Sequence, residues 1–151
     1  MNHIASFFVP GVPVGKMRAK VVHRGRFVRE YSPDKQTKYE AHVRECYRGK
    51  KQSSLPLSLI ILSVLPVPKS FSKKKRKDCL TCDILPTSKP DTDNIAKSIM
   101  DALNGFAYTD DKQVTCVMSL KVYGDDPGAY VVIDEADTNN FKKAVDLIVS
   151  K

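Results

Sequence analysis

The sequence lacks the segments that would place the chain in or across a membrane. It contains no apolar run of about 18 residues or more, which excludes a membrane-spanning helix. The first residues, Met1 to Ile4, have neither the basic start nor the small-residue cleavage site of a signal peptide. We therefore expect a cytoplasmic protein, and at 151 residues we expect one domain spanning 1–151.

The sequence is also poor in the ligands of a zinc site. Cys79 and Cys82 have metal-ligand spacing, but a structural zinc site needs a second pair. The other cysteines, Cys46 and Cys116, stand alone, and the three histidines form no matching doublet. We expect free, reduced thiols.

Charge is distributed unevenly along the chain. Residues 1–90 contain 19 Lys and Arg against 6 Asp and Glu, whereas residues 91–151 contain 6 against 11. A basic half favours a polyanionic partner, most often nucleic acid, although lysine-rich surfaces can also be merely solvated. An acidic half beside it suits a metal site, so a nuclease accounts for both halves.

The candidate DNA-binding residues are basic side chains in three segments. Lys16, Arg18 and Lys20 alternate and so share one face of an extended segment, where they either follow a phosphate backbone or protect a sheet edge. A predicted hairpin of 20–22 with 26–28 has a basic tip. A run of five cations follows Pro68, where Ser72 is able to cap a short helix. The full set is Lys16, Arg18, Lys20, Arg24, Arg26, Lys69, Lys73, Lys74, Lys75, Arg76 and Lys77.

Hydrophobic periodicity predicts an α+β fold with a small mixed or antiparallel sheet packed against helices. The predicted strands are 6–9, the hairpin, a central buried strand at 57–65, a half-buried strand at 114–122, and 130–133 pairing antiparallel to it. The predicted helices begin at Ser32-Pro33, span 92–104, and begin again at Asp137-Thr138. In the strand at 114–122, the apolar residues at even-numbered positions are expected to be buried.

Two pairs of aspartates flank the helix at 92–104. Asp91 and Asp93 stand at its start, and Asp110 and Asp111 follow its end. The helix is roughly 18 Å long, and the seven steps from Asn104 to Asp111 span at most about 23–25 Å. A nearly extended return through 106–108 therefore brings Asp111 to Asp91 and Asp93.

Three carboxylates without His or Cys form a hard oxygen site, which suits Mg²⁺, with Mn²⁺ as a plausible substitute. Such a site beside a basic surface indicates phosphodiester hydrolysis. Lys97 is expected to contact the phosphate or leaving group, or to pair with Asp93 or Asp101 along the helix. A helix cap is the alternative for Asp91 or Asp93. Asp101 and Asp110 are expected to contact the metal ligands without binding the metal themselves, or to lie on the helix surface.

At these residues the sequence resembles a known family. The segments Pro90-Asp91-Thr92-Asp93-Asn94, Asp101-Ala102-Leu103-Asn104-Gly105 and Thr109 to Val114, with Lys97 and Gln113, closely resemble the core of the RusA family of Holliday-junction resolvases. The resemblance extends to about Ile133 through Pro10-Gly11, Tyr31-Ser32-Pro33, Pro68-Lys69-Ser70 and Lys121-Val122-Tyr123-Gly124. It implies a Mg²⁺-dependent endonuclease that acts as a homodimer on four-way DNA junctions.

The resemblance also assigns roles. It implies that Asp91, Asp93 and Asp111 are the catalytic aspartates and metal ligands and that Lys97 is the essential lysine. Asp110, Asp101 and Gln113 are our own candidates for residues that support them. A homodimer follows from function as well, because resolving a junction needs two symmetric cuts and one chain carries one site. The alternatives are a DNA-binding protein with a structural metal, and a less selective nuclease that cuts flaps or forks.

Overall fold

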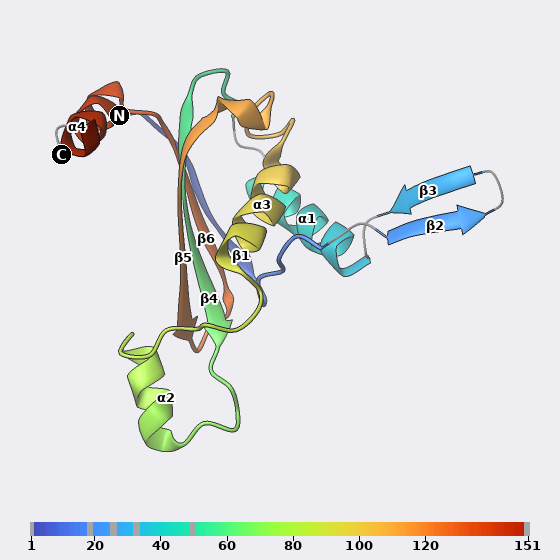
Figure 1. Ribbon diagram of the computed structural model, residues 1–151, viewed down its shortest axis with the longest axis vertical. Coiled ribbons are helices and arrows are strands. Elements are labelled where there is room, and N and C mark those ends of the chain that lie inside the picture. Colours follow the sequence, from blue (N-terminus) through green and yellow to red (C-terminus); the bar gives the residue numbers. More distant parts are fainter. Residues whose placement is uncertain (1, 18–19, 25–26, 32–33, 49–50, 150–151) are drawn as a thin grey trace.

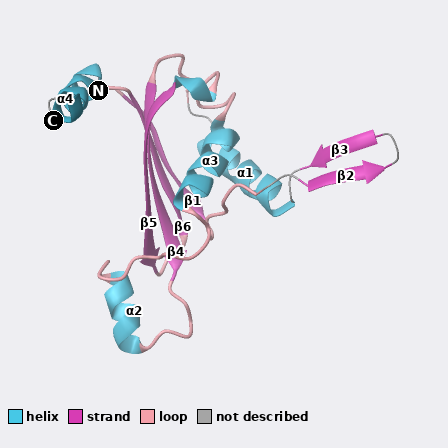
Figure 2. Cartoon of the chain, viewed as in Figure 1, coloured by secondary structure: helices cyan, strands magenta, loops and turns pink. Residues whose placement is uncertain are grey.

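The computed structural model describes residues 2–17, 20–24, 27–31, 34–48 and 51–149, with side chains in all of these except 20–24 and 27–31. The fold is α+β, as the sequence predicts (Figures 1 and 2). The elements in chain order are β1 (His3–Pro10), β2 (Lys20–Arg24), β3 (Phe27–Tyr31), α1 (Asp34–Tyr47), β4 (Leu57–Pro66), α2 (Lys73–Leu80), α3 (Thr92–Leu103), the 3₁₀ turn η1 (Asp111–Gln113), β5 (Val114–Gly124), β6 (Gly128–Glu135) and α4 (Thr138–Val149).

Four strands form one mixed sheet in the order β1-β6-β4-β5. β4, the most apolar segment, is an inner strand as predicted; it pairs antiparallel with β6 and parallel with β5. A parallel pair needs a crossover connection, and here α2 and α3 lie in that crossover. β2 and β3 form the predicted hairpin, which projects away from the sheet (Figure 1).

The prediction that β6 pairs with β5 is wrong, because β4 lies between them. The turn at residues 124–128 crosses the end of β4 instead of closing a hairpin. A Cβ atom at Gly124 would lie 2.5 Å from Cγ1 of Val64 in β4, so the crossing needs glycine at this position. The turn signal in the sequence was correct, but it does not specify which strand lies beside it.

Helices α1 and α3 pack on one face of the sheet and against each other (Figure 1). Their apolar stripes meet the inward positions of the strands in a single core. The largest fully buried side chains include Leu59, Ile61 and Ile133 from the sheet, Val43 from α1, and Ile95, Ile99 and Leu103 from α3. This packing fixes the orientation of α3, and therefore of the polar residues on its outer side.

None of the helices that the structure describes covers the middle of the other face of the sheet (Figure 1). Four large apolar side chains are exposed on it. Met118 is 54% exposed, Leu120 and Tyr130 are each 48% exposed, and Ile60 is 39% exposed. These four residues, which are neighbours in the strand register, define the open sheet face. The prediction that the even-numbered positions of β5 are buried is therefore wrong for Cys116, Met118 and Leu120.

Helices α2 and α4 lie at opposite ends of the sheet (Figure 1). Ser72 caps α2 as predicted, accepting a hydrogen bond from the Lys75 amide at 3.3 Å. Arg76 pairs with Asp125 of the crossing turn, which ties α2 to the sheet. α4 is amphipathic as predicted, but none of its residues is buried. No helix among the described residues is long and apolar enough to cross a membrane.

Candidate functional site

Helix α3 presents the first candidate carboxylates at its N-terminal end. Because its apolar stripe packs into the core, the polar positions of the first turn face outward. Asp91 occupies the N-cap position, but its side chain accepts no capping hydrogen bond. Its nearest polar contact is Nδ2 of Asn94, at 3.5 Å. Asp91 is therefore not used as a helix cap, and its carboxylate remains exposed.

Asp93, Lys97 and Asp111 line one hollow of about 600 Å³ between α3 and β5, which we call the acidic hollow. All three are exposed. Lys97 makes no ion pair within the part of the chain that the structure describes, so the predicted alternative of a pair with Asp93 or Asp101 is not seen. The rest of the wall consists of Thr92, Ala96, Met100, Asp101, Val117 and Ser119.

Asp91 lines a neighbouring hollow of about 800 Å³, which we call the basic hollow. Its charged wall residues are Lys16, Lys35, Lys89 and Asp91. The structure thus brings Asp93 and Asp111 to one hollow and Asp91 to the next, on the two sides of the first turn of α3. Over residues 2–17, 34–48 and 51–149, no three His, Cys, Asp or Glu side chains gather closely enough to hold a metal ion.

The return from α3 to Asp111 is a compact turn, so the predicted extended path through 106–108 is wrong. The amides of Phe106 and Ala107 both donate to the Leu103 carbonyl at 2.9 Å. Tyr108 is fully buried, and its hydroxyl donates to the Met100 carbonyl at 2.7 Å. This anchor brings Asp111 alongside the helix. Burial raises the pKa of Tyr108, and the nearby carboxylates of Asp111 and Asp101 raise it further.

Asp110 and Gln113 hold the loop that presents Asp111. Asp110 accepts from the Lys112 amide at 3.0 Å, while Oε1 of Gln113 accepts from the Thr109 and Asp110 amides at 2.8 and 3.1 Å. The Gln113 amide nitrogen donates to two carbonyls in the segment before β4. The Lys112 backbone N–H and then its ammonium lower the pKa of Asp110. Asp110 is therefore engaged with Lys112, and Asp111 is left exposed.

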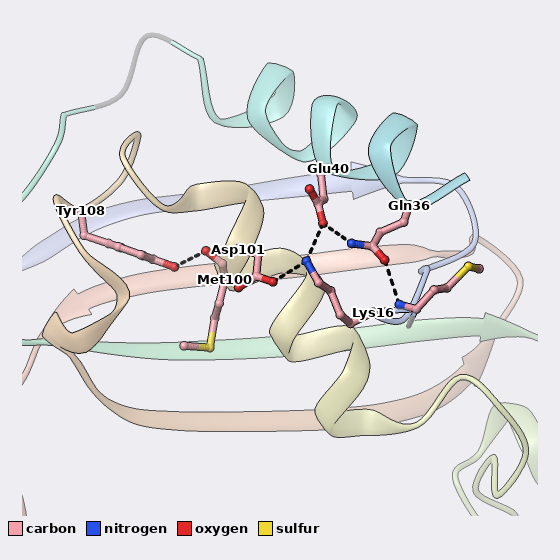
Figure 3. A network of polar contacts seen from close by, with 7 residues as sticks. Lys16, Gln36, Glu40, Met100, Asp101 and Tyr108 are labelled. Atoms are coloured by element: carbon pink, nitrogen blue, oxygen red, sulfur yellow. Dashed lines mark hydrogen bonds and ion pairs between the residues drawn. The ribbon is translucent and has the colours of Figure 1, made fainter. Parts of the chain in front are cut away.

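Lys16, a predicted DNA contact, is paired with two carboxylates in the structure (Figure 3). Its Nζ lies 2.6 Å from Oδ2 of Asp101 and 3.3 Å from Oε1 of Glu40. Gln36, which is fully buried, donates to the same Glu40 oxygen at 2.7 Å and accepts from the Met17 amide at 2.8 Å. Burial lowers the pKa of Lys16, but the bonds to Asp101 and Glu40 outweigh it, and the net shift is upward. This network joins the segment after β1 to α1 and α3.

Sequence reasoning missed the residues that support the site. The sequence predicts Glu40 on a solvated helix face, and only its i,i+4 spacing from Gln36 indicates a side-chain pair. The alternation of β5 predicts that Lys121 faces solvent. Its ammonium instead donates to the carbonyls of Ser88 and Pro90 at 2.8 and 3.1 Å. Lys121 thereby fixes the backbone just before Asp91.

The remaining basic candidates whose side chains the structure describes, Lys69 and the cations of α2, do not line either hollow. Arg18 and Arg26 lie outside the described residues, and for Lys20 and Arg24 the structure gives only the backbone of β2. Lys69 and the cations of α2 are exposed. Within α2, Arg76 is paired with Asp125.

Lys75 Nζ lies 3.7 Å from the centre of the Phe71 ring, so this cation of α2 is partly engaged as well. The cysteines are free, as predicted: Cys79 is buried in α2, and Cys82 is exposed beyond it.

Comparison with known proteins agrees with these motifs. A protein of Bacillus subtilis (strain 168) named uncharacterized protein YqaN is 35% identical over 134 residues, which cover 85% of this chain and 94% of that protein. Residues 10–134 match the family described as endodeoxyribonuclease RusA, a range that includes every candidate catalytic residue. The chain therefore belongs to the RusA family of endodeoxyribonucleases, as its sequence motifs predict.

Proposed function

We propose that the protein is a Mg²⁺-dependent, structure-selective endodeoxyribonuclease that resolves four-way DNA junctions by paired symmetric cuts. One observation carries the proposal: the aspartates around α3 fall into two groups. Asp101 is paired with Lys16, and Asp110 with Lys112. Asp91, Asp93 and Asp111 have no cationic partner among the described side chains. The unpaired three are the ones that the family resemblance assigns to catalysis.

The donor chemistry of these aspartates fits a magnesium centre. They are exposed carboxylates, the described residues that line the two hollows include no Cys or His, and Mg²⁺ prefers such oxygen ligands. We assign Asp93 and Asp111 as ligands from the acidic hollow, and Asp91 as a ligand from the adjoining turn. When bound, Mg²⁺ would activate water and stabilise charge on the phosphate. Mn²⁺ is a plausible substitute.

Lys97 is the remaining catalytic candidate. It faces the acidic hollow one turn after Asp93, and it has no competing ion pair within the described residues. We assign its ammonium to a non-bridging phosphate oxygen or to the leaving oxygen, where a fixed positive charge is most effective. Asp101, which Lys16 holds at the edge of the hollow, and Asp110 and Gln113 are assigned supporting roles.

We further propose that DNA contacts the exposed cations of α2 and the β2–β3 hairpin. Among the cations of α2, Lys73, Lys74 and Lys77 are exposed and, within the described residues, unpaired. Phosphate contacts of this kind position a protein on DNA without reading its sequence.

A DNA substrate is also consistent with a cytoplasmic location, which we propose on that basis.

The protein is proposed to act as a homodimer. Two symmetric cuts require two sites, and a two-fold dimer supplies both. The open sheet face supports this proposal, because its four exposed apolar residues, on β4, β5 and β6, lie on the side of the sheet opposite α1 and α3. We assign this face to contact with a second copy of the chain.

The proposal is tested by incubating the protein with Mg²⁺ and three labelled substrates: a four-way junction, a linear duplex and a fork. We expect paired nicks at symmetric positions of the junction and little cleavage of the duplex, because only the junction offers two strands in two-fold relation. Equal rates on all three substrates would favour the less selective nuclease. Binding without cleavage would favour a DNA-binding protein whose metal is structural.

A further inference from the structure

We propose that the basic hollow is a binding site for a second DNA phosphate, adjacent to the scissile one, and that Lys35 and Lys89 are the residues that bind it. This inference rests on the proposed nuclease function and extends it to a phosphate that is not cleaved. Neither lysine belongs to the basic segments that the sequence singles out. Both become candidates only because the fold brings them together.

The two lysines come from different elements and converge on one hollow. Lys35 lies in the first turn of α1, and Lys89 lies just before α3. Both side chains are exposed, and neither makes an ion pair within residues 2–17, 34–48 and 51–149. Lys16 also lines the hollow, but Asp101 and Glu40 hold its ammonium. Among the described side chains that line the basic hollow, Lys35 and Lys89 are therefore the cations without an ion pair.

The wall between these lysines is held in place by contacts from three directions. Lys121 donates to the carbonyls of Ser88 and Pro90, the residues on either side of Lys89. The Lys16 amide donates to the Asn94 carbonyl at 2.8 Å, which joins the segment after β1 to α3. A Cβ atom at Gly15 would lie 3.1 Å from Pro90 Cβ, so these two segments are in close contact. The backbone around Lys89 is thus held in place before any ligand binds.

A phosphate is the ligand that this arrangement fits. Two unpaired ammonium groups face one carboxylate, Asp91, which stands at the border with the acidic hollow. The first amides of α3 also remain free of a side-chain cap, which adds favourable potential for an anion. The acidic hollow lies across the same helical turn, since Asp93 follows Asp91 by two residues. A DNA strand that crosses this turn would present one phosphate to each hollow.

The neighbouring site also resolves an electrostatic difficulty. Unpaired carboxylates in the acidic hollow repel a phosphodiester until a cation is bound. A positive site next to them attracts the same strand by its adjacent phosphate and so raises the local concentration of substrate. Lys35 and Lys89 are accordingly inferred to be binding residues, not catalytic ones.

The test compares the salt dependence of binding to a labelled four-way junction in the absence of divalent metal. Lys35→Gln and Lys89→Gln are each expected to lower the slope of log K against log [KCl] by about 1 for each protomer bound, because one phosphate contact is lost. Lys143→Gln, in α4 at the far end of the sheet, serves as the control and should keep the wild-type slope. Lys35→Arg and Lys89→Arg should restore the slope, since they keep the charge.

A wild-type slope in the Lys35→Gln/Lys89→Gln double variant would overturn the second phosphate site. That failure is distinguishable from failure of the proposed function, which is measured separately as Mg²⁺-dependent cleavage by the wild-type protein. If the wild type cuts junctions while the double variant binds with an unchanged slope, only the phosphate site is wrong. If the wild type neither binds nor cuts junctions, both proposals are wrong.

Discussion

Replacing Asp93 with Asn is expected to lower junction cleavage on the order of 1,000-fold while leaving junction binding intact. The substitution keeps the shape of the side chain but removes its charge, and so removes one ligand of the proposed magnesium centre. Asp93 is exposed and makes no ion pair within the described residues, so folding does not depend on it. Asp111→Asn is expected to behave in the same way, because both carboxylates line the acidic hollow.

The matched control is Asp126→Asn, an exposed aspartate in the crossing turn. It should cleave at the wild-type rate. Thermal unfolding checks that all three variants fold, and a mobility-shift assay without metal checks that they bind. Cleavage by Asp93→Asn at the wild-type rate would exclude this residue as a metal ligand. Loss of the melting transition together with loss of activity would instead indicate a structural role.

The second large effect is expected at the open sheet face. Met118→Asp should convert the protein to a monomer at concentrations at which the wild type is a dimer. A buried, unpaired carboxylate within an interface costs about 2 kcal/mol or more, which raises the dissociation constant of the dimer about 30-fold or more. In a two-fold dimer the substitution occurs twice, so the effect is amplified.

Leu85→Asp is the matched control, because Leu85 is 55% exposed, close to the 54% of Met118, but lies in the loop beyond α2. It should leave the dimer intact. Analytical ultracentrifugation measures the association state, and mapping of cuts on a junction measures the consequence. The monomeric variant is expected to leave single, unpaired nicks. A dimer that persists in Met118→Asp would show that the second copy binds elsewhere.

The strands and helices of the chain were largely predictable, most of them from their apolar patterns and α2 from its Ser72 cap. The pairing of the strands was not predictable from the sequence. β5 and β6 are joined by a short turn, which normally favours a hairpin, but the apolar segment of β4 occupies the position between them. Tertiary packing of the most hydrophobic strand overrides the local turn signal. The close approach of Gly124 to Val64 reflects the crossing of the turn over the end of β4.

The site was predictable at the level of residue types, but less so in its geometry. The predicted helix start beside Asp91 and Asp93 is confirmed, and the role of these carboxylates as metal ligands stays a prediction. The path to Asp111 was predicted from maximum chain length alone, and the anchor of Tyr108 on Met100 changes it. The ion pairs of Lys16 with Asp101 and Glu40 depend on the packing of α1 against α3, and no local sequence pattern predicts that packing.

The central claim is that the acidic hollow between α3 and β5 is the metal centre of a nuclease. Crystals of the wild-type protein grown with Mn²⁺ test it most directly, because the anomalous signal of manganese distinguishes the ion from water and lighter ions. We expect an anomalous peak in the acidic hollow, in contact with the carboxylates of Asp93 and Asp111. A hollow without anomalous density, in a protein that cleaves junctions at the same Mn²⁺ concentration, would contradict the account.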